Sequence, residues 1–355
     1  MDILRTDIYC VLCGGPFDLE PSVYNLDPQN DAYQWLYSVR LLSTVTALSN
    51  LCMSSGDEKQ INMSGDDEVF LSDSTRWAVT DADVFLLGNS YYQVLMEDHN
   101  GDLIFPLHCT CIDIACMVGK IHPNLDANSQ VSSPVGQLLS RLRFQYHHCK
   151  YFAGLIGNDI FDLSSSYAMH GPKSLLAIDE LDWWGDCHEK FLTDPVEVPN
   201  LAAFVIEILK ATPQRTKCLV HVNEPVRTPQ SLERFPNETL DRISDFLPPC
   251  SIINLHKTSK ALAQKVPLDD RFWRMHLRDG SLLPHMWDLD TQELDPSISN
   301  KKFANIGLWD WKSLIQLLFK KEFPVSGLDS RIDQIPPGFW NRCRIWRIVE
   351  EIYSK

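Results

Sequence analysis

The sequence lacks the short motifs that mark the commonest enzyme active sites. It contains no Walker A loop, no G-x-G-x-x-G turn, no G-x-S-x-G nucleophile turn and no H-E-x-x-H zinc helix. Such motifs cradle phosphates, expose a reactive serine or bind a catalytic metal, because each spacing puts the required groups on one turn. No nucleophile paired with a base stands out in their place. We therefore expect that the chain is not an enzyme.

Basic residues are also scarce. Lysine and arginine number 32 against 47 aspartates and glutamates, which gives a net charge of −15 and a pI near 5.1. A protein that binds nucleic acid needs clustered positive charge to neutralise the phosphates. The acidic balance therefore leads us to expect no nucleic-acid partner.

Long apolar runs and a regular cysteine framework are missing as well. No apolar stretch is long enough to span a bilayer, and the segment from Met1 to Phe17 does not have the pattern of a signal peptide. The eleven cysteines are an odd number without regular spacing, which is typical of a reducing compartment rather than of a secreted disulfide scaffold. We expect a cytoplasmic and/or nuclear protein without a membrane partner.

The composition is that of a globular protein, with 44% hydrophobic and 22% charged residues among 355. That length predicts two domains, or one large domain with an appended module. Changes in pattern divide the chain into a mixed N-terminal domain, a proline-bearing linker and two helical segments. We place these parts at residues 1–211, 212–230, 231–278 and 279–355. The expected fold class is therefore α+β: a mixed N-terminal domain with a small antiparallel hairpin, followed by helices.

Three patterns inside the N-terminal domain predict its local structure. Apolar residues recur at helical spacing over 33–50, which predicts a helix. Two apolar segments, 91–96 and 103–107, flank Asn100-Gly101 and predict the hairpin, because this dipeptide tolerates the positive φ angles of a tight turn. The acidic and turn-rich stretch 53–76 predicts a flexible loop.

Two cysteines near the start, Cys10 and Cys13, form a CxxC pair followed by two glycines. Two thiolates at this spacing can bind one tetrahedral zinc ion, which then needs two further ligands. We expect His108 and Cys111 to supply them, since they form an H-x-x-C pair at the end of the predicted hairpin. The next candidates along the same segment are Cys109 and Cys116. Two alternatives stay open: small buried cysteines on a strand, and a redox-active pair.

The segment 231–278 predicts a chain of short helices. Pro236 suits the first turn of a helix, and Leu240, Ile243 and Leu247 then fall on one face at a spacing of three to four residues. Two prolines end that helix, and polar residues farther on can cap two more. A hydrophobic core made from fewer than about 50 residues is marginal. Part of the apolar surface is therefore expected to pack on the rest of the chain or on another protein.

This segment resembles the F-box. The family pattern is Leu-Pro-x-Glu, then apolar residues at helical spacing, a turn, a second helix, a Val-Ser-Lys-like triplet and a late tryptophan. In this sequence Phe235-Pro236-Asn237-Glu238 opens the pattern, Thr258-Ser259-Lys260 forms the triplet and Trp273 closes it. Phenylalanine replaces the usual leucine, and threonines at 239 and 258 replace aliphatic residues. The position along the chain is uncommon, but it is similar to that in fungal F-box proteins with a CxxC-bearing N-terminal domain and a tryptophan-rich tail.

The resemblance implies a partner and a mechanism. F-box proteins bind Skp1, and through it a cullin-RING scaffold that holds an E2 enzyme, while the rest of the chain presents a protein target. The expected role is that of a substrate receptor in an SCF-type ubiquitin ligase. Tethering would raise the effective concentration of the target near the E2 enzyme. By this resemblance, the residues of the F-box core or of its Skp1-facing surface are Phe235, Pro236, Glu238, Leu240, Ile243, Leu247, Ile252, Leu255, Ser259 and Trp273.

Other interpretations stay open for the function and for the C-terminal region. The chain can instead be a Skp1-bound scaffold, or a zinc-stabilised interaction module, that acts outside the ligase. The region 279–355 is rich in tryptophan and arginine, and Arg342, Arg344 and Arg347 can form a surface that binds an acidic or phosphorylated target. The same pattern also suits a closing helix packed against the F-box-side bundle.

Overall fold

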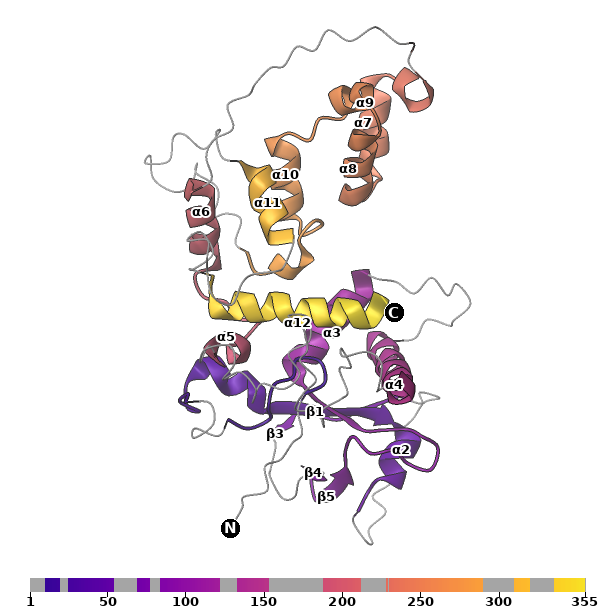
Figure 1. The fold of residues 1–355 in the computed structure, drawn as a ribbon, viewed down its shortest axis with the longest axis vertical. Helices are drawn as coiled ribbons and strands as arrows, with labels where there is room; N and C mark the ends of the chain where they lie inside the picture. The colour runs from indigo at the N-terminus through magenta and orange to yellow at the C-terminus, as the bar shows by residue number, and fades with distance from the viewer. Residues whose placement is uncertain are drawn as a thin grey trace. The chain divides into compact units, whose positions relative to one another are not determined.

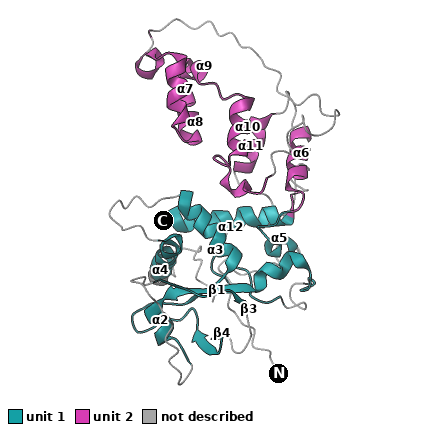
Figure 2. Ribbon diagram, turned by 180° about the vertical axis from the view of Figure 1, so that it is seen from behind, with its two compact units in different colours: residues 1–198, 337–355 teal, residues 199–336 magenta. Residues whose placement is uncertain are grey.

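The computed structural model describes residues 10–19, 25–53, 69–76, 84–121, 133–152, 188–211, 228, 230–289, 310–319 and 335–354. The chain falls into two units (Figure 2): residues 1–198 with 337–355 form unit 1, and residues 199–336 form unit 2. Unit 1 contains antiparallel strands and helices, whereas the described part of unit 2 is helical. The expected α+β class is therefore confirmed.

The main sheet of unit 1 is built around strand β1 (Ser38–Thr44). Strands β2 (Val69–Leu71) and β3 (Thr75–Arg76) pair with successive halves of one edge of β1, and β6 (Phe105–His108) pairs with the other edge. All of these pairings are antiparallel, and Val39 stands opposite His108. The end of β6 therefore lies beside the start of β1.

Residues 33–50 do not form the predicted helix. A 3₁₀ helix, η1 (Asp31–Tyr37), is followed by β1 and then by the short helix α2 (Val45–Asn50), whose N-cap Thr44 accepts a hydrogen bond from the Ala47 N–H. β1 is buried over most of its length. The partners of β1 are distant in sequence, and apolar spacing alone cannot distinguish a short buried strand from a segment of a buried helix. The prediction was wrong for this reason.

The hairpin of unit 1 lies earlier in the chain than predicted. Strands β4 (Val84–Leu87) and β5 (Ser90–Gln93) pair through a turn that contains Gly88, whose φ of +64° favours glycine. The predicted second strand instead runs into β6, which pairs with β1. The predicted loop at 53–76 is also partly wrong, because it contains β2 and β3; its residues 54–68 lie outside the described residues.

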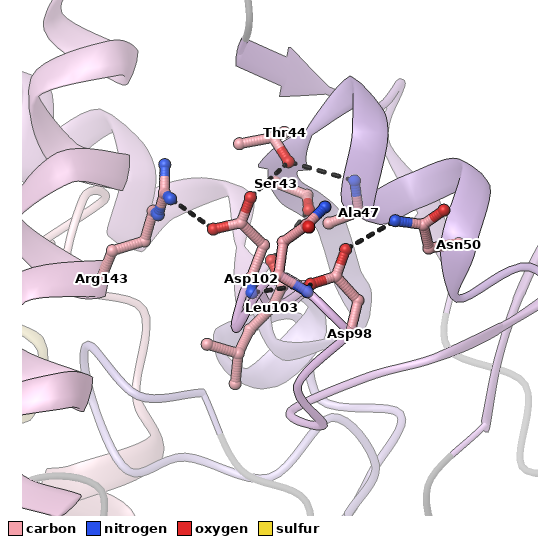
Figure 3. A network of polar contacts seen from close by, with 9 residues as sticks. Ser43, Thr44, Ala47, Asn50, Asp98, Asp102, Leu103 and Arg143 are labelled. Atoms are coloured by element: carbon pink, nitrogen blue, oxygen red, sulfur yellow. Dashed lines mark hydrogen bonds and ion pairs between the residues drawn. The ribbon is translucent and has the colours of Figure 1, made fainter.

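The predicted Asn-Gly turn exists, but it connects β5 to β6 rather than closing a hairpin. Asp98 Oδ1 accepts two backbone N–H groups of the turn, each at 2.8 Å, and Asn50 donates to Asp98 Oδ2 at 2.7 Å (Figure 3). The buried Asp102 carboxylate pairs with Arg143 of helix α4 (Pro134–Phe152). Side-chain bonds thus fix the loop from which β6 enters the sheet.

The helices of unit 1 pack around α12 (Pro337–Ser354), the last helix of the chain (Figure 1). It contacts α3 (Cys109–Ile121) and α5 (His188–Leu192), and α3 in turn contacts β1 and β6. Most side chains of α12 are buried, on all sides of the helix. A helix with this burial pattern is a core element, because a surface helix keeps one polar face in water.

The place of α12 corrects the expectation that 279–355 forms one C-terminal region. The Arg342 guanidinium donates to the carbonyls of Pro195 and Val196, at 2.6 and 2.7 Å, and Asn341 donates to the Thr193 carbonyl at 2.8 Å. These acceptors follow α5 in unit 1. Buried polar groups need such partners, so α12 belongs to unit 1.

The described helices of unit 2 are short. Helices α7, α8 and α9 surround a small core of buried aliphatic side chains, whereas α11 contacts α10 and α6. None of the described helices of the chain is long and apolar enough to cross a membrane. The elements of unit 2 are α6 (Leu201–Ala211), η3 (Ser231–Arg234), α7 (Asn237–Asp245), α8 (Pro249–Thr258), α9 (Lys260–Lys265), α10 (Asp270–Arg278), η4 (Pro284–Met286) and α11 (Trp311–Phe319).

Gly338 in the first turn of α12 leaves no room for a side chain, since a Cβ there would lie 2.3 Å from the Asp194 carbonyl oxygen. We expect Gly338→Ala to lower the free energy of unfolding of unit 1 by about 1–3 kcal/mol, as overpacked substitutions do. Amide hydrogen exchange across 337–354, followed by mass spectrometry, measures the loss. Ser354→Ala, an exposed change in the same helix, is the control. Equal exchange in both variants would contradict the close packing.

Candidate functional site

The CxxC turn, residues 10–15, is closed by backbone hydrogen bonds. The Cys10 carbonyl accepts from the N–H groups of Cys13 and Gly14, at 3.2 and 2.7 Å, and the Cys10 N–H donates to the Gly15 carbonyl at 3.0 Å. Gly14 has a φ of +68°, which glycine adopts without strain. Residues 11–13 therefore form a turn and not a strand, unlike the alternative that placed buried cysteines on a strand.

Four side chains from two distant segments meet beside this turn: Cys10, Cys13, His108 and Cys111. Their ligand atoms all lie within 4.8 Å of one another, and all four residues are fully buried. β6 ends at His108 and α3 begins at the next residue, so Cys111 lies in the first turn of that helix. The structure thus brings together the four residues that the sequence indicated. We call them the Cys₃His cluster.

The His108 ring is held with one nitrogen toward the sulfurs. Its Nδ1 lies 3.3 Å from Cys13 Sγ and 4.0 Å from Cys111 Sγ, whereas Nε2 lies 3.1 Å from the Pro16 carbonyl oxygen. Trp35 packs against the ring at a centroid distance of 4.9 Å. A neutral imidazole that donates from Nε2 to this carbonyl keeps the Nδ1 lone pair for a metal ion.

The donor set is that of a closed metal site. Gly15 donates its N–H to Cys13 Sγ at 3.2 Å, and a Cβ on Gly15 would lie only 3.1 Å from the same sulfur. Three thiolates and one imidazole are a ligand set of structural zinc sites, whereas catalytic zinc keeps an open coordination position. Because the cluster is fully buried, it can hold a metal ion in its interior.

The groups of the Cys₃His cluster shift one another's pKa values. Burial acts to raise the pKa of Cys10, but hydrogen bonds from Cys111 and Cys13 and the charge of His108 bring it well below its usual value. Burial acts to lower the pKa of His108, but the charges of Cys13 and Cys10 raise it to about 10. Burial raises the pKa of Cys111, and hydrogen bonds to the other two cysteines add to this. The cluster therefore favours a thiolate at Cys10, and the thiolate is the form that binds metal.

The two next candidates for ligands do not join the cluster. Cys109 Sγ lies 3.2 Å from Ser38 Oγ and 3.4 Å from Ser74 Oγ. Cys116 is half-buried farther along α3. Within the described chain, the H-x-x-C spacing thus selected the pair that meets Cys10 and Cys13, because it spans the junction of a strand with the first turn of a helix.

A buried arginine from α12 contacts the same turn. Arg344 donates from Nη1 to the Cys13 carbonyl at 2.5 Å and from Nη2 to the Phe191 carbonyl at 3.4 Å, and it is 7% exposed. Arg342, two residues earlier, is fully buried. The idea that Arg342 and Arg344 form a surface for an acidic target is therefore wrong, because both guanidinium groups bond to backbone carbonyls inside unit 1.

The residues selected by the F-box resemblance differ in exposure. The buried core of this segment consists of Leu240, Ile252, Leu262 and Val266. The half-buried residues packed against it include Ile243, Leu247 and Leu255. The exposed positions are Phe235, Pro236 and Glu238. Of the remaining two, Ser259 caps α9 by accepting the Leu262 N–H at 3.1 Å, and buried Trp273 donates its indole N–H to the Leu268 carbonyl at 3.0 Å.

One residue that the sequence analysis did not select is conspicuous in this segment. Phe246 is 87% exposed, more than any other large apolar side chain in the described chain. Helix α7 ends at Asp245, so the helical spacing that pointed to Leu247 no longer applies there. Leu247 packs against the small core, and Phe246 faces water. The feature of the sequence that could have identified Phe246 as exposed is its position directly after the last turn of an amphipathic helix.

Comparison of the chain with protein-family models, curated proteins and solved structures finds no match. Two features of the described residues bear on function: the buried Cys₃His cluster of unit 1 and the exposed aromatic side chains of residues 231–278 in unit 2.

Proposed function

We propose that residues 231–278 dock on Skp1 and that the chain serves as a substrate receptor of an SCF-type ubiquitin ligase. The observation that carries this proposal is the exposure of Phe246 on a segment that already has a small core of its own. The resemblance of the segment to the F-box supplies the identity of the partner.

The exposed side chains of this segment favour a protein partner. Phe235, Met275 and Phe246 are 42%, 51% and 87% exposed. Exposed apolar side chains can mark interaction sites, and aromatic residues are enriched among those that dominate binding energy. A helix whose apolar side chains enter a groove of the partner is a recurring form of recognition. Half-buried Ile243 and Leu247 can contribute to the same contact, since neither is fully enclosed by the core.

Docking through residues 231–278 leaves the rest of the chain to bind the target. On this proposal the chain does no chemistry of its own. Skp1 and a cullin-RING scaffold hold the E2 enzyme, and tethering raises the effective concentration of the target near it. Unit 1, which includes α12, then carries the surface that binds the target.

We further propose that the Cys₃His cluster binds one structural Zn²⁺. Thiolate ligands select soft ions such as zinc, whereas Mg²⁺ and Ca²⁺ take oxygen ligands. The ion would join the CxxC turn to the junction of β6 and α3. Cys13 and His108, one ligand from each segment, are 95 positions apart in the sequence. Its binding free energy would then become folding free energy of unit 1. A zinc-stabilised interaction module outside the ligase is the second candidate function, favoured by this cluster.

Phe246→Asp should weaken docking strongly and leave the segment folded. The side chain lies outside the small core, so we expect a change in stability of only about 0.5 kcal/mol. The Skp1 binding free energy should weaken by about 2–4 kcal/mol, as for an aromatic hot spot. Titration calorimetry of purified Skp1 with the full chain measures the affinity, and circular dichroism checks the fold.

Phe319→Asp is the matched control, since Phe319 is 51% exposed at the end of α11 and outside residues 231–278. This variant should bind Skp1 as tightly as the unchanged chain. Undiminished Skp1 affinity of Phe246→Asp would refute the proposed docking face. Affinity capture from cells separates the two functions: a ligase receptor retains Skp1 together with a cullin, and a scaffold retains Skp1 alone.

The full chain, purified without chelators, should contain about one zinc ion per molecule. Cys111→Ser should lose most of this zinc, because it removes one of four ligands. It should also lower the midpoint of thermal unfolding of unit 1, whose fold the ion would stabilise. Plasma mass spectrometry measures the metal, and amide hydrogen exchange assigns the loss of stability to unit 1.

Cys109→Ser is the control for this experiment. Cys109 lies two residues before Cys111 but contacts Ser38 and Ser74 instead of the cluster. It should keep its zinc. Near-zero zinc in the unchanged chain, or equal zinc in the two variants, would eliminate the metal centre.

A further inference from the structure

Arg344 is a buried cation without a carboxylate partner in the described parts of the chain. Its guanidinium bonds to the carbonyls of Cys13 and Phe191 and to the side-chain oxygen of Asn341, at 2.8 Å from Nη2. Burial lowers its pKa, while the charges of Cys13, Cys111 and Cys10 act to raise it. Among the described residues, the titratable groups that act on this arginine are thus the cysteines of the Cys₃His cluster.

A buried guanidinium needs a compensating negative charge, because an isolated charge loses its hydration when it leaves water. Carbonyl oxygens and the Asn341 amide oxygen satisfy the hydrogen bonds of Arg344 but supply no net charge. Only the cysteines can supply it among the groups described around Arg344. They do so as thiolates, the form in which cysteine binds metal.

The charge balance of the site favours a divalent ion. Three thiolates and a neutral imidazole around a divalent ion carry one net negative charge, which Arg344 neutralises. A monovalent ion would leave the site with one negative charge in excess, and a trivalent ion with one positive charge in excess. Three neutral thiols without a metal ion would leave Arg344 uncompensated, whereas a thiolate at Cys10 alone would balance it. Among the metal-bound states with all three cysteines ionised, the charge balance therefore favours a divalent ion.

We propose that Arg344 is a positioning residue of the metal centre, which balances its charge and joins α12 to the CxxC turn. The inference rests on the proposed zinc centre and adds a residue from a part of the chain 331 positions away from Cys13. Its bond to the Cys13 carbonyl orients the peptide that carries a ligand. Groups of this kind around metal ligands commonly set the affinity for the ion.

Arg342, two residues earlier on α12, provides an internal comparison. It is buried like Arg344 and also bonds to backbone carbonyls, those of Pro195 and Val196. Its nearby charge is the Asp194 carboxylate, whose pKa burial raises and Arg342 acts to lower. Arg342 and Arg344 therefore both bond to backbone carbonyls of unit 1, and among their described hydrogen bonds it is one from Arg344 that reaches the CxxC turn.

The test compares zinc affinity in Arg344→Met and Arg342→Met. Both variants remove a buried guanidinium from the same helix, so both should lose stability. Only Arg344→Met should weaken zinc binding, by about 10–100-fold, in competition with a chromophoric chelator. Arg344→Lys should recover most of the affinity because it keeps the charge, whereas Arg344→Gln should not. The absorption spectrum of bound Co²⁺ should stay tetrahedral in every variant, which shows that the four ligands are still in place.

Each outcome decides the inference. Unchanged zinc affinity in Arg344→Met, or an equal loss in Arg342→Met, overturns the role of Arg344 while the zinc centre stands. Absence of zinc from the unchanged chain overturns the zinc centre and this inference together. If Arg344→Met does not fold, the Lys and Gln variants decide, and equal affinity in these two overturns the role of charge.

Discussion

The burial of the Cys₃His cluster is the constraint on which unit 1 depends. The cluster lies where the CxxC turn, the end of β6 and the start of α3 meet, and Arg344 of α12 bonds to the same turn. Groups that ionise are costly to bury unless their charges are balanced locally. Segments from the beginning, the middle and the end of the chain therefore meet in one small volume. There the positive charge of the proposed zinc ion would balance the negative charge of the thiolates.

The sequence predicted this site well and the surrounding fold less well. Cys10, Cys13, His108 and Cys111 could be selected because metal binding restricts residue type and spacing, and both are visible in the sequence. The helix predicted at 33–50 failed because β1 obtains its hydrogen bonds from β2, β3 and β6, which are distant in sequence. Pairing partners of this kind leave no local signal, so periodicity alone could not reveal the strand.

The misplacement of α12 and the omission of Phe246 have related physical causes. Arginines in a tryptophan-rich helix suggested a surface, but Arg342 and Arg344 find backbone carbonyls as acceptors, which a sequence pattern does not show. Helical spacing pointed to Leu247 rather than Phe246, because nothing in the apolar pattern fixed the end of α7 at Asp245. In both cases the side-chain environment was set by where a helix ends or what it meets, and not by composition.

The two units would be stabilised in different ways, residues 231–278 of unit 2 by a binding partner and unit 1 by a metal ion. The small core of residues 231–278 has four buried aliphatic side chains, and a core of this size contributes little stability alone. Exposed Phe246 adds apolar surface that a partner can cover, so binding there would stabilise the segment as well as hold it. Unit 1 has a larger interior of its own, and the proposed ion would act inside it. A metal-ordered unit 1 would keep its surface fixed whether or not Skp1 is bound. That independence is what a receptor needs, because tethering works only when the target stays bound while the ligase assembles around it.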